Sequence, residues 1–176
     1  IYSKKKNILV LFNYVPELYD FLLWSQQLFA ESLGKNKKGF LPVISNAPKD
    51  HHSLLQLYLD GPKDKIFYVF SSKQKKNLKL SSTFFTEKMK YLNKKNYNDI
   101  KLSQKNAFLK VLKENKIPFR EIKIKKFDEE TIGQLFLSFI LETIALGKIM
   151  QVNPYDQPGV EKVKVLTKEF LTLKKF

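Results

Sequence analysis

Short apolar runs of strand length recur along the chain, separated by longer stretches with helical spacing. Residues 7–14 (NILVLFNY), 40–46 and 66–71 are nearly continuous apolar runs, which is typical of buried strands. Residues 119–125 instead alternate apolar with polar side chains, which favours an edge strand with one wet face. The pattern therefore predicts four strands.

The stretches between these strands carry helix start and stop signals. Pro16 opens a helical pattern that ends at Gly34, and Asp50 is the expected N-cap of a helix that continues through Leu59. Asp128 is expected to cap a long helix that ends near Met150. Further helices are predicted over residues 82–92, over residues 103–115, and after a Pro-bearing turn at residues 152–158.

Alternation of strand and helix predicts the α/β class, with a mostly parallel sheet covered by helices on both faces. In such sheets the ligand crevice lies beyond the carboxyl ends of the strands, which directs attention to the loops after Tyr14, Asn46 and Ser71. Residues 1–150 are expected to form the α/β domain. Residues 151–176 are expected to form a turn and a terminal helix packed on it.

Composition excludes several classes of protein and site. Hydrophobic residues make up 43% and aromatic residues 14%, and this apolar content is too high for a disordered chain. The six glycines never cluster, so neither a dinucleotide fingerprint nor a P-loop can be written. The chain has no cysteine, so disulfides, thiolate zinc sites and cysteine nucleophiles are excluded.

The formal charge of +15 would favour binding to the phosphate backbone of nucleic acid, but the composition of the basic residues argues against specific binding. Arg120 is the only arginine, and the lysines are spread through predicted loops and strand edges. Residues 132–150 carry Gln134, Glu142 and Lys148, which predicts a buried amphipathic helix rather than a membrane span. With no visible signal peptide, we expect a cytoplasmic piece of a longer protein that binds neither membrane nor specific nucleic acid.

The first candidate site lies on the helix predicted after Pro16. Asp20, Trp24, Gln27 and Glu31 are spaced by 4, 3 and 4 residues and share one helix stripe. A carboxylate beside buried surface can have a raised pKa that suits a general base. Alternatively, Gln27 and Glu31 lie on the wet side of an ordinary amphipathic helix.

The second candidate is Asp50-His51-His52, which holds the only histidines of the chain. In the first turn of a helix, the positive end of the helix dipole favours neutral imidazole, which can accept or donate a proton near pH 7. Adjacent histidines on a helix point about 100° apart, which does not suit a shared metal. The alternative is a pair of surface histidines.

The third candidate is the turn that begins at Asn153 and leads into the last helix. With Pro158 at the first helical position, Gln157, Glu161 and Lys164 share one side of that helix. An ion pair of Glu161 with a neighbouring lysine is the simpler interpretation.

Together these segments resemble the phosphoglucose isomerase (glucose-6-phosphate isomerase) family, specifically its C-terminal half. The best match is GKIMQVNPYDQPGVEKVK, residues 147–164. WSQQLFAESLGK, residues 24–35, and DHHSLLQLYLDGP, residues 50–62, support it. The resemblance covers nearly the whole chain and implies a three-layer sandwich of the sugar-isomerase type.

The resemblance implies an aldose-ketose isomerase that interconverts glucose 6-phosphate and fructose 6-phosphate through a cis-enediol, without metal or organic cofactor. Glu31 matches the family's base, which carries a proton between C2 and C1, and Gln27 matches a glutamine that lines the site. His52 matches a ring-opening histidine that the family contributes to the partner subunit's site, which implies a homodimer. Gln157 matches a site glutamine, and Lys164 a lysine that shares in ring opening.

Departures from the family limit what the chain should do alone. The family's first domain with its Ser/Thr-rich phosphate loop, and its glycine-arginine pair, have no counterpart here, and Arg120 lies outside any family motif. Val163 stands where many members have Gly and His51 where many have Gln, but neither change removes a reacting group. We therefore expect an incomplete, inactive fragment of an isomerase. The alternative is a non-catalytic sugar-phosphate-binding domain.

Overall fold

The computed structural model describes residues 6–72, 79–80 and 85–173, and four strands in them form one sheet. The strands are β1 (Ile8–Asn13), β2 (Leu41–Asn46), β3 (Lys65–Ser72) and β4 (Phe119–Ile124). Their order is β2-β1-β3-β4, and every neighbouring pair is parallel. The predicted α/β class, the parallel sheet and the position of β4 at the sheet edge are confirmed.

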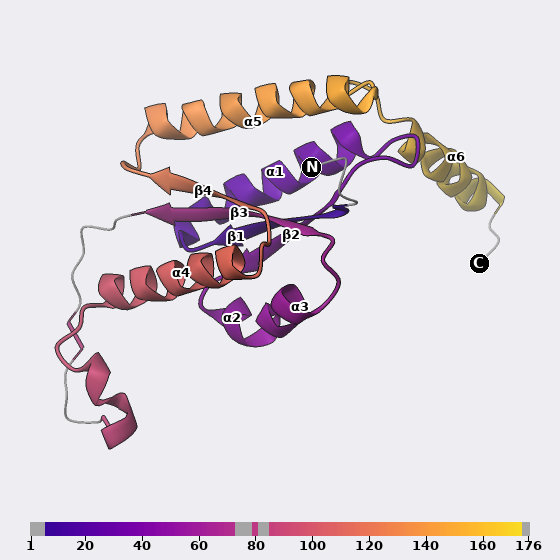
Figure 1. Cartoon of the computed structure of the whole chain (residues 1–176). Helices are drawn as coiled ribbons and strands as arrows, with labels where there is room; N and C mark the ends of the chain where they lie inside the picture. Colours follow the sequence, from indigo (N-terminus) through magenta and orange to yellow (C-terminus); the bar gives the residue numbers. More distant parts are fainter. Residues whose placement is uncertain (1–5, 73–78, 81–84, 174–176) are drawn as a thin grey trace.

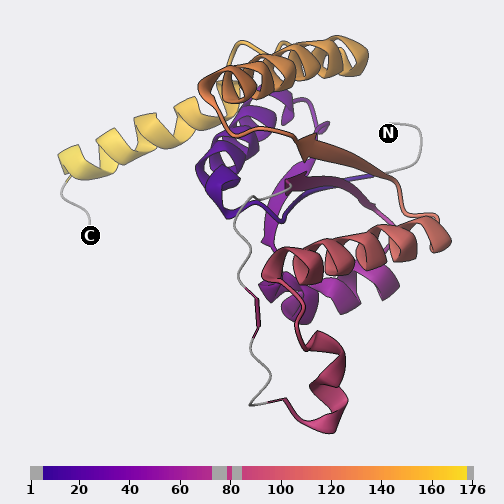
Figure 2. The same ribbon diagram turned by 90° about the vertical axis from the view of Figure 1, so that its left-hand side faces the viewer.

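Helices cover both faces of this sheet, as predicted (Figure 1). One face is covered by α1 (Tyr19–Leu33), which a short 3-10 helix η2 (Pro16–Leu18) precedes, and by α5 (Glu129–Met150). The other face is covered by α2 (Lys49–Ser53), α3 (Leu55–Asp60) and α4 (Tyr97–Glu114). Figure 2 shows the same three layers from the side.

Alternating side chains of the strands divide the interior into two cores. Leu9 and Leu11 of β1 pack in the core beneath α1 and α5, whereas Val10 and Phe12 pack in the core beside α4. The two-residue period of a strand makes this division, and it requires both faces of a central strand to be apolar. The continuous apolar runs of β1 and β3 therefore reflect their central places in the sheet.

Helix α5 is less buried than its sequence predicted. It packs along α1 with Phe139, Thr143, Gly147 and Met150 buried, while large side chains such as Leu141 (56% exposed) line its outer face. Among the described helices, α5 has the length and hydropathy of a membrane span, and 22% of its most apolar stretch is buried. One such helix is weak evidence for a membrane span, since core helices can have the same length and hydropathy.

Three helix boundaries differ from the predictions. Asp50 does not cap its helix, because it lies inside α2 and its buried carboxylate accepts from the backbone N–H of Asn46 at 2.7 Å. The predicted single helix through Leu59 is instead two short helices that meet at Leu54. Helix α4 begins six residues before the predicted 103, because the Asn96 side chain caps it.

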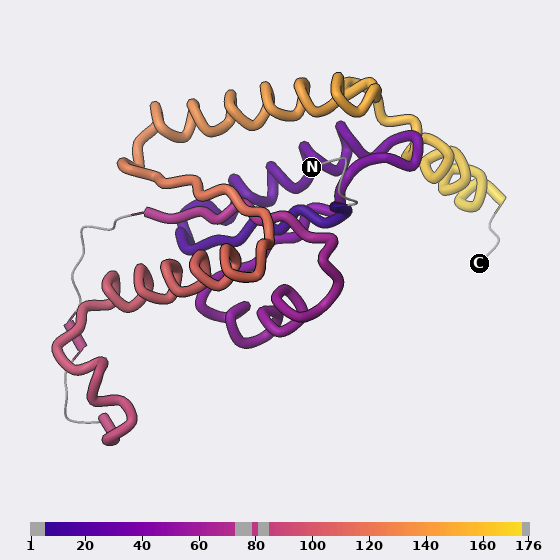
Figure 3. Tube along the Cα trace, in the orientation of Figure 1, coloured from indigo at the N-terminus to yellow at the C-terminus, as the bar shows by residue number. Residues whose placement is uncertain are grey.

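The predicted helix over residues 82–92 falls partly outside the described residues. Only η3 (Glu87–Leu92), a 3-10 helix, is described there. It lies in a loop that extends away from the sheet before α4 begins, as the tube in Figure 3 makes plain. The predicted Asp128 cap of α5 is confirmed, since its carboxylate accepts from the N–H of Thr131 at 3.0 Å.

The last helix, α6 (Pro158–Leu173), extends past the edge of the sheet and has no buried residue (Figure 2). Pro158 begins it, as predicted. The preceding turn, in contrast, contacts the body, where Val152 is 7% exposed. The turn is thus attached to the α/β domain, while α6 stands clear of it.

Candidate functional site

The structure brings three of the predicted site residues together at the C-terminal end of α1. Glu31 accepts a hydrogen bond from the side-chain amide of Gln27, one turn earlier, at 3.0 Å. The amide of Gln157 reaches its second carboxylate oxygen at 2.8 Å, from 126 positions further along the chain. Gln27, Glu31 and Gln157 therefore form one polar cluster, in which amide donors from two segments hold both oxygens of one carboxylate.

This cluster does not lie at the carboxyl ends of the strands, where the sequence analysis expected the ligand crevice. Helix α1 leads from the carboxyl end of β1 back to the start of the parallel strand β2, so its last turn lies toward the amino ends of the strands. A hollow of about 270 Å³ does exist at the carboxyl ends of β1 and β2, and Asn13, Pro16, Tyr19, Asn46 and Ala47 line it. It contains none of the predicted site residues.

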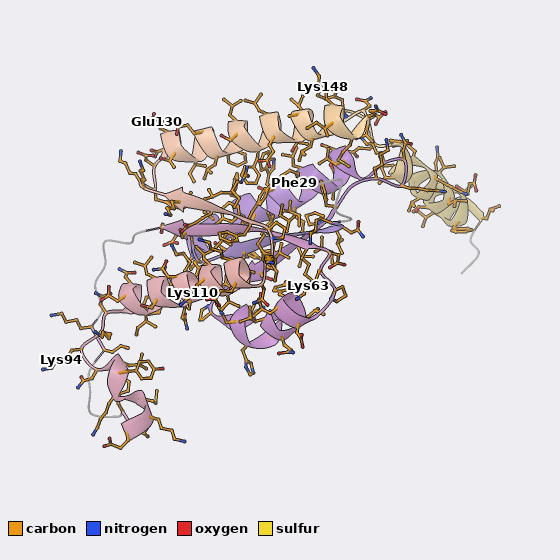
Figure 4. The ribbon with its side chains drawn as sticks, in the orientation of Figure 1. Phe29, Lys63, Lys94, Lys110, Glu130 and Lys148 are labelled. Carbon is orange, nitrogen blue, oxygen red and sulfur yellow. The ribbon has the colours of Figure 1, made fainter. Side chains whose placement is uncertain are left out.

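The side chains of Gln27, Glu31 and Gln157 are all exposed. The apolar residues of α1 that the sequence analysis identified do bury one side of the helix, including Leu22, Phe29 and Leu33. Phe29, labelled in Figure 4, belongs to the core that α1 and α5 form with the sheet. The alternative interpretation, in which Gln27 and Glu31 lie on the exposed side of an amphipathic helix, therefore describes this chain. Its described residues supply amide donors to the carboxylate but no apolar side chain that covers it.

The turn that carries Gln157 is held against α1 and α5 by specific contacts. Lys35 Nζ donates to the backbone carbonyl of Asn153 and lies 2.9 Å from the Asp156 carboxylate. This ion pair lowers the pKa of Asp156. On α5, a Cβ added to Gly147 would lie 3.3 Å from the ring of Pro154, so glycine allows the turn to approach closely.

Lys35 is a residue that sequence reasoning missed as part of the site. It stands in the segment WSQQLFAESLGK, but no local spacing links it to Asp156, because the two residues lie in distant parts of the chain. The only signal was its place just beyond the end of α1, where the helix dipole favours a cation.

Lys164 does not join the cluster around Glu31. Its Nζ lies 2.8 Å from Glu161 one turn earlier, and both side chains are 65% exposed. This is the simple ion pair that the sequence left as an alternative. Lys164 lies on an open face of α6 on which no other described element packs.

His52 lies on the opposite side of the sheet from Glu31. It belongs to α2, which covers the face that α1 does not cover (Figure 1). Its side chain is exposed. The neighbouring His51 is half-buried, contacts the rings of Phe12 and Phe108, and hydrogen bonds to the hydroxyl of Tyr14. Burial lowers the pKa of His51, which favours the neutral imidazole predicted for this helix.

Across the described parts of the chain, no three His, Asp or Glu side chains gather in a way that could hold a metal ion. The cluster at Glu31 offers one carboxylate with amide donors, and an ionised carboxylate has acceptor sites to spare after two hydrogen bonds. Such a group can take a proton from a bound molecule.

Solved structures with the same arrangement identify the fold. A crystal structure of a hypothetical protein from Thermus thermophilus superposes with a TM-score of 0.86 at 28% identity, over 94% of this chain and 41% of that one. A glucose-6-phosphate isomerase from Chlamydia trachomatis superposes with a TM-score of 0.72 over 97% of this chain and 36% of that one. Its 16% identity bears on the fold alone. The chain therefore has an α/β fold of the sugar-isomerase type.

Sequence relatives carry the identification further. A probable glucose-6-phosphate isomerase of Methanococcus maripaludis is 36% identical over 98% of this chain, and the glucose-6-phosphate isomerase of Methanocaldococcus jannaschii is 38% identical over 93%. These matches span 39% and 41% of the relatives' own lengths. No protein-family model matches the chain. The chain is thus related to the glucose-6-phosphate isomerases over about two fifths of their length, and the resemblance stated from its sequence is confirmed.

Proposed function

We propose that this chain is the base-carrying part of an aldose-ketose isomerase that interconverts glucose 6-phosphate and fructose 6-phosphate. The observation that carries the proposal is the cluster at Glu31. Residues from the two segments that most resemble the isomerases meet there, although 126 positions separate Glu31 from Gln157. Relatives named as glucose-6-phosphate isomerases support the same assignment.

In the proposed reaction, the Glu31 carboxylate removes the proton from C2 of the open-chain sugar phosphate and returns it to C1 of the resulting cis-enediol. A single carboxylate is sufficient for this transfer, because the proton taken from one carbon is given to its neighbour. Gln27 and Gln157 donate to the two carboxylate oxygens and so hold the carboxylate in one orientation.

Ring opening is assigned to Lys164 and His52. Lys164 would have to leave Glu161, but an exposed pair at this helical spacing is worth only about 0.2–0.5 kcal/mol. That energy is small enough for a bound substrate to redirect the ammonium group. Within one chain, His52 and Glu31 lie on opposite faces of the sheet, which supports a homodimer in which His52 serves the partner subunit's site.

The test is Glu31→Gln in the complete polypeptide that contains this chain. Glutamine keeps the shape but cannot accept the C2 proton, so turnover should fall about 10²–10⁴-fold. Exchange of the C2 proton with deuterated solvent, followed by NMR, should fall in parallel. Glu130→Gln, at the far end of α5, is the control and should leave both rates unchanged (Figure 4). Full turnover and exchange in Glu31→Gln would show that the base lies elsewhere.

Mixing subunits tests the assignment of His52. Co-expressed Glu31→Gln and His52→Ala chains should form mixed dimers in which one of the two sites has both native residues. Activity should therefore return in the mixture, although each variant alone is impaired. A mixture no more active than its parents would place His52 in its own chain's site or outside the site. Substrate binding by the wild type without turnover would favour the non-catalytic binding domain.

A further inference from the structure

Lys35 is an almost buried lysine whose charged group faces the turn before α6. Its side chain is 8% exposed, which is unusual for a lysine unless the ammonium group is paired. It donates to the carbonyl of Asn153, 118 positions away, and forms an ion pair with Asp156 at 2.9 Å. A lysine buried in this way is committed to one geometry.

The loop that holds Lys35 has a defined shape. Asn36 and Lys37 adopt positive φ values of 53° and 60°, and Gly39 has a φ of 115° where a Cβ would lie 2.9 Å from the backbone of Gly34. Lys38 from the same loop donates to the carbonyl of Met150 at 2.8 Å. The loop thus contacts the end of α5 through Lys38 and the following turn through Lys35.

The contacts of Lys35 lead directly to the candidate base. Asp156 is also held by the side-chain amide of Asn153 at 3.0 Å, and the next residue along the chain is Gln157. Gln157 in turn donates to Glu31, which lies in the last turn of α1 just before the loop that contains Lys35. Lys35, just after α1, therefore contacts Asp156, and the adjacent Gln157 contacts Glu31 of α1. These two contacts join the end of α1 to the turn before α6.

We infer that Lys35 is a positioning residue, which fixes the turn at residues 153–157 so that the Gln157 amide reaches the Glu31 carboxylate. The inference rests on the proposed function for its effect on catalysis. Lys35 itself has no role in proton transfer. Without the lysine, Asp156 would lose its cation and the turn would lose the bond to Asn153, so Gln157 would no longer be held at Glu31.

The experiment compares Lys35→Met with Lys38→Met in the complete polypeptide. Lys35→Met should lower kcat at least about tenfold while KM for fructose 6-phosphate changes less than threefold, because a misoriented base weakens the chemical step. Lys38→Met removes the contact to the carbonyl of Met150 at the end of α5 and should leave kcat unchanged.

Two further variants keep the inference open to test if Lys35→Met does not fold. Lys35→Arg should rescue most of kcat, because arginine can pair with the same carboxylate. Asp156→Asn changes a side chain that is 54% exposed, so it should fold and reproduce the loss of kcat. A folded Lys35→Met or Asp156→Asn protein with native kcat would overturn the inference.

A structural readout separates this inference from the proposed function. In the complete polypeptide, NMR contacts between the Gln157 amide and Glu31 should disappear in Lys35→Met and persist in Lys38→Met. If the complete polypeptide shows no isomerase activity, this result still decides whether Lys35 positions Gln157. Native contacts in Lys35→Met would overturn the positioning role whatever the activity.

Discussion

The α/β body and the C-terminal helix are stabilised in different ways. In the body, Phe139 of α5 is 2% exposed and packs near the rings of Phe21, Phe29 and Phe70. Phe170 of α6 is 53% exposed, and no residue of that helix is buried. A phenylalanine on a helix with apolar positions is thus part of the core in the α/β body but is exposed to solvent on α6.

This difference shows how a site can depend on the less stable region. The body is held by apolar burial from both faces of the sheet, which is the largest favourable term in folding. The turn that brings Gln157 to Glu31 is held mainly by polar contacts around Lys35 and Asn153. We therefore expect substitutions in the body to affect stability and substitutions at the turn to affect the geometry of the site.

The largest expected effect separates the two phenylalanines. Phe139→Ala should lower the free energy of unfolding by about 3–5 kcal/mol, because it opens a cavity beneath α5. Phe170→Ala, the matched substitution on α6, should change it by less than about 0.5 kcal/mol. Urea unfolding monitored by circular dichroism measures both values. Equal losses would show that α6 is packed against the body in solution.

A smaller effect should distinguish two lysine ion pairs. Lys105 has an 8% exposed side chain and joins α4 to Glu121 of β4, which also accepts from Ser71 at 3.1 Å. Lys105→Met should cost roughly 1–2 kcal/mol, because it leaves a largely buried carboxylate with fewer partners. Lys164→Met removes an exposed partner of Glu161 and should cost less than about 0.5 kcal/mol. The same unfolding measurement applies, and a larger loss for Lys164→Met would contradict the comparison.

The smallest effect concerns pH and the two histidines. Burial lowers the pKa of His51 below its unfolded value near 6.5, so the unfolded chain binds this proton more readily than the folded chain. The contribution of neutral His51 should therefore be complete above about pH 6.5 and be lost as the pH falls toward the folded pKa. Protonation would also make both ring nitrogens donors and place a charge beside the Tyr14 hydroxyl, whose own pKa burial raises.

Melting temperatures of His51→Gln and His52→Gln between pH 7 and pH 5 check this expectation. His51→Gln should reduce the loss of stability toward pH 5, whereas His52→Gln should follow the wild type, because the His52 side chain is exposed. A wild-type pH dependence that survives in His51→Gln would assign it to other groups.

Much of the fold could be predicted because it depends on local periodicity. Three apolar runs and one alternating pattern correctly marked the four described strands, and Pro16, Gly34, Asp128 and Pro158 marked helix ends, since caps and prolines act within one turn. The helix at Asp50 was mispredicted, because that carboxylate turns back to Asn46 rather than capping the helix. The early start of α4 was missed because the capping side chain of Asn96 precedes the apolar pattern.

For the candidate site, the sequence by itself determined the pairing of Gln27 with Glu31, because four residues make about one helical turn. It also carried the resemblance to the isomerases. Only the tertiary structure decided that Gln157 meets Glu31, that Lys35 holds Asp156, and that His52 lies on the other face of the sheet. Helical and strand periods act over a few residues, whereas contacts between distant segments depend on how loops and packed layers place whole elements in space.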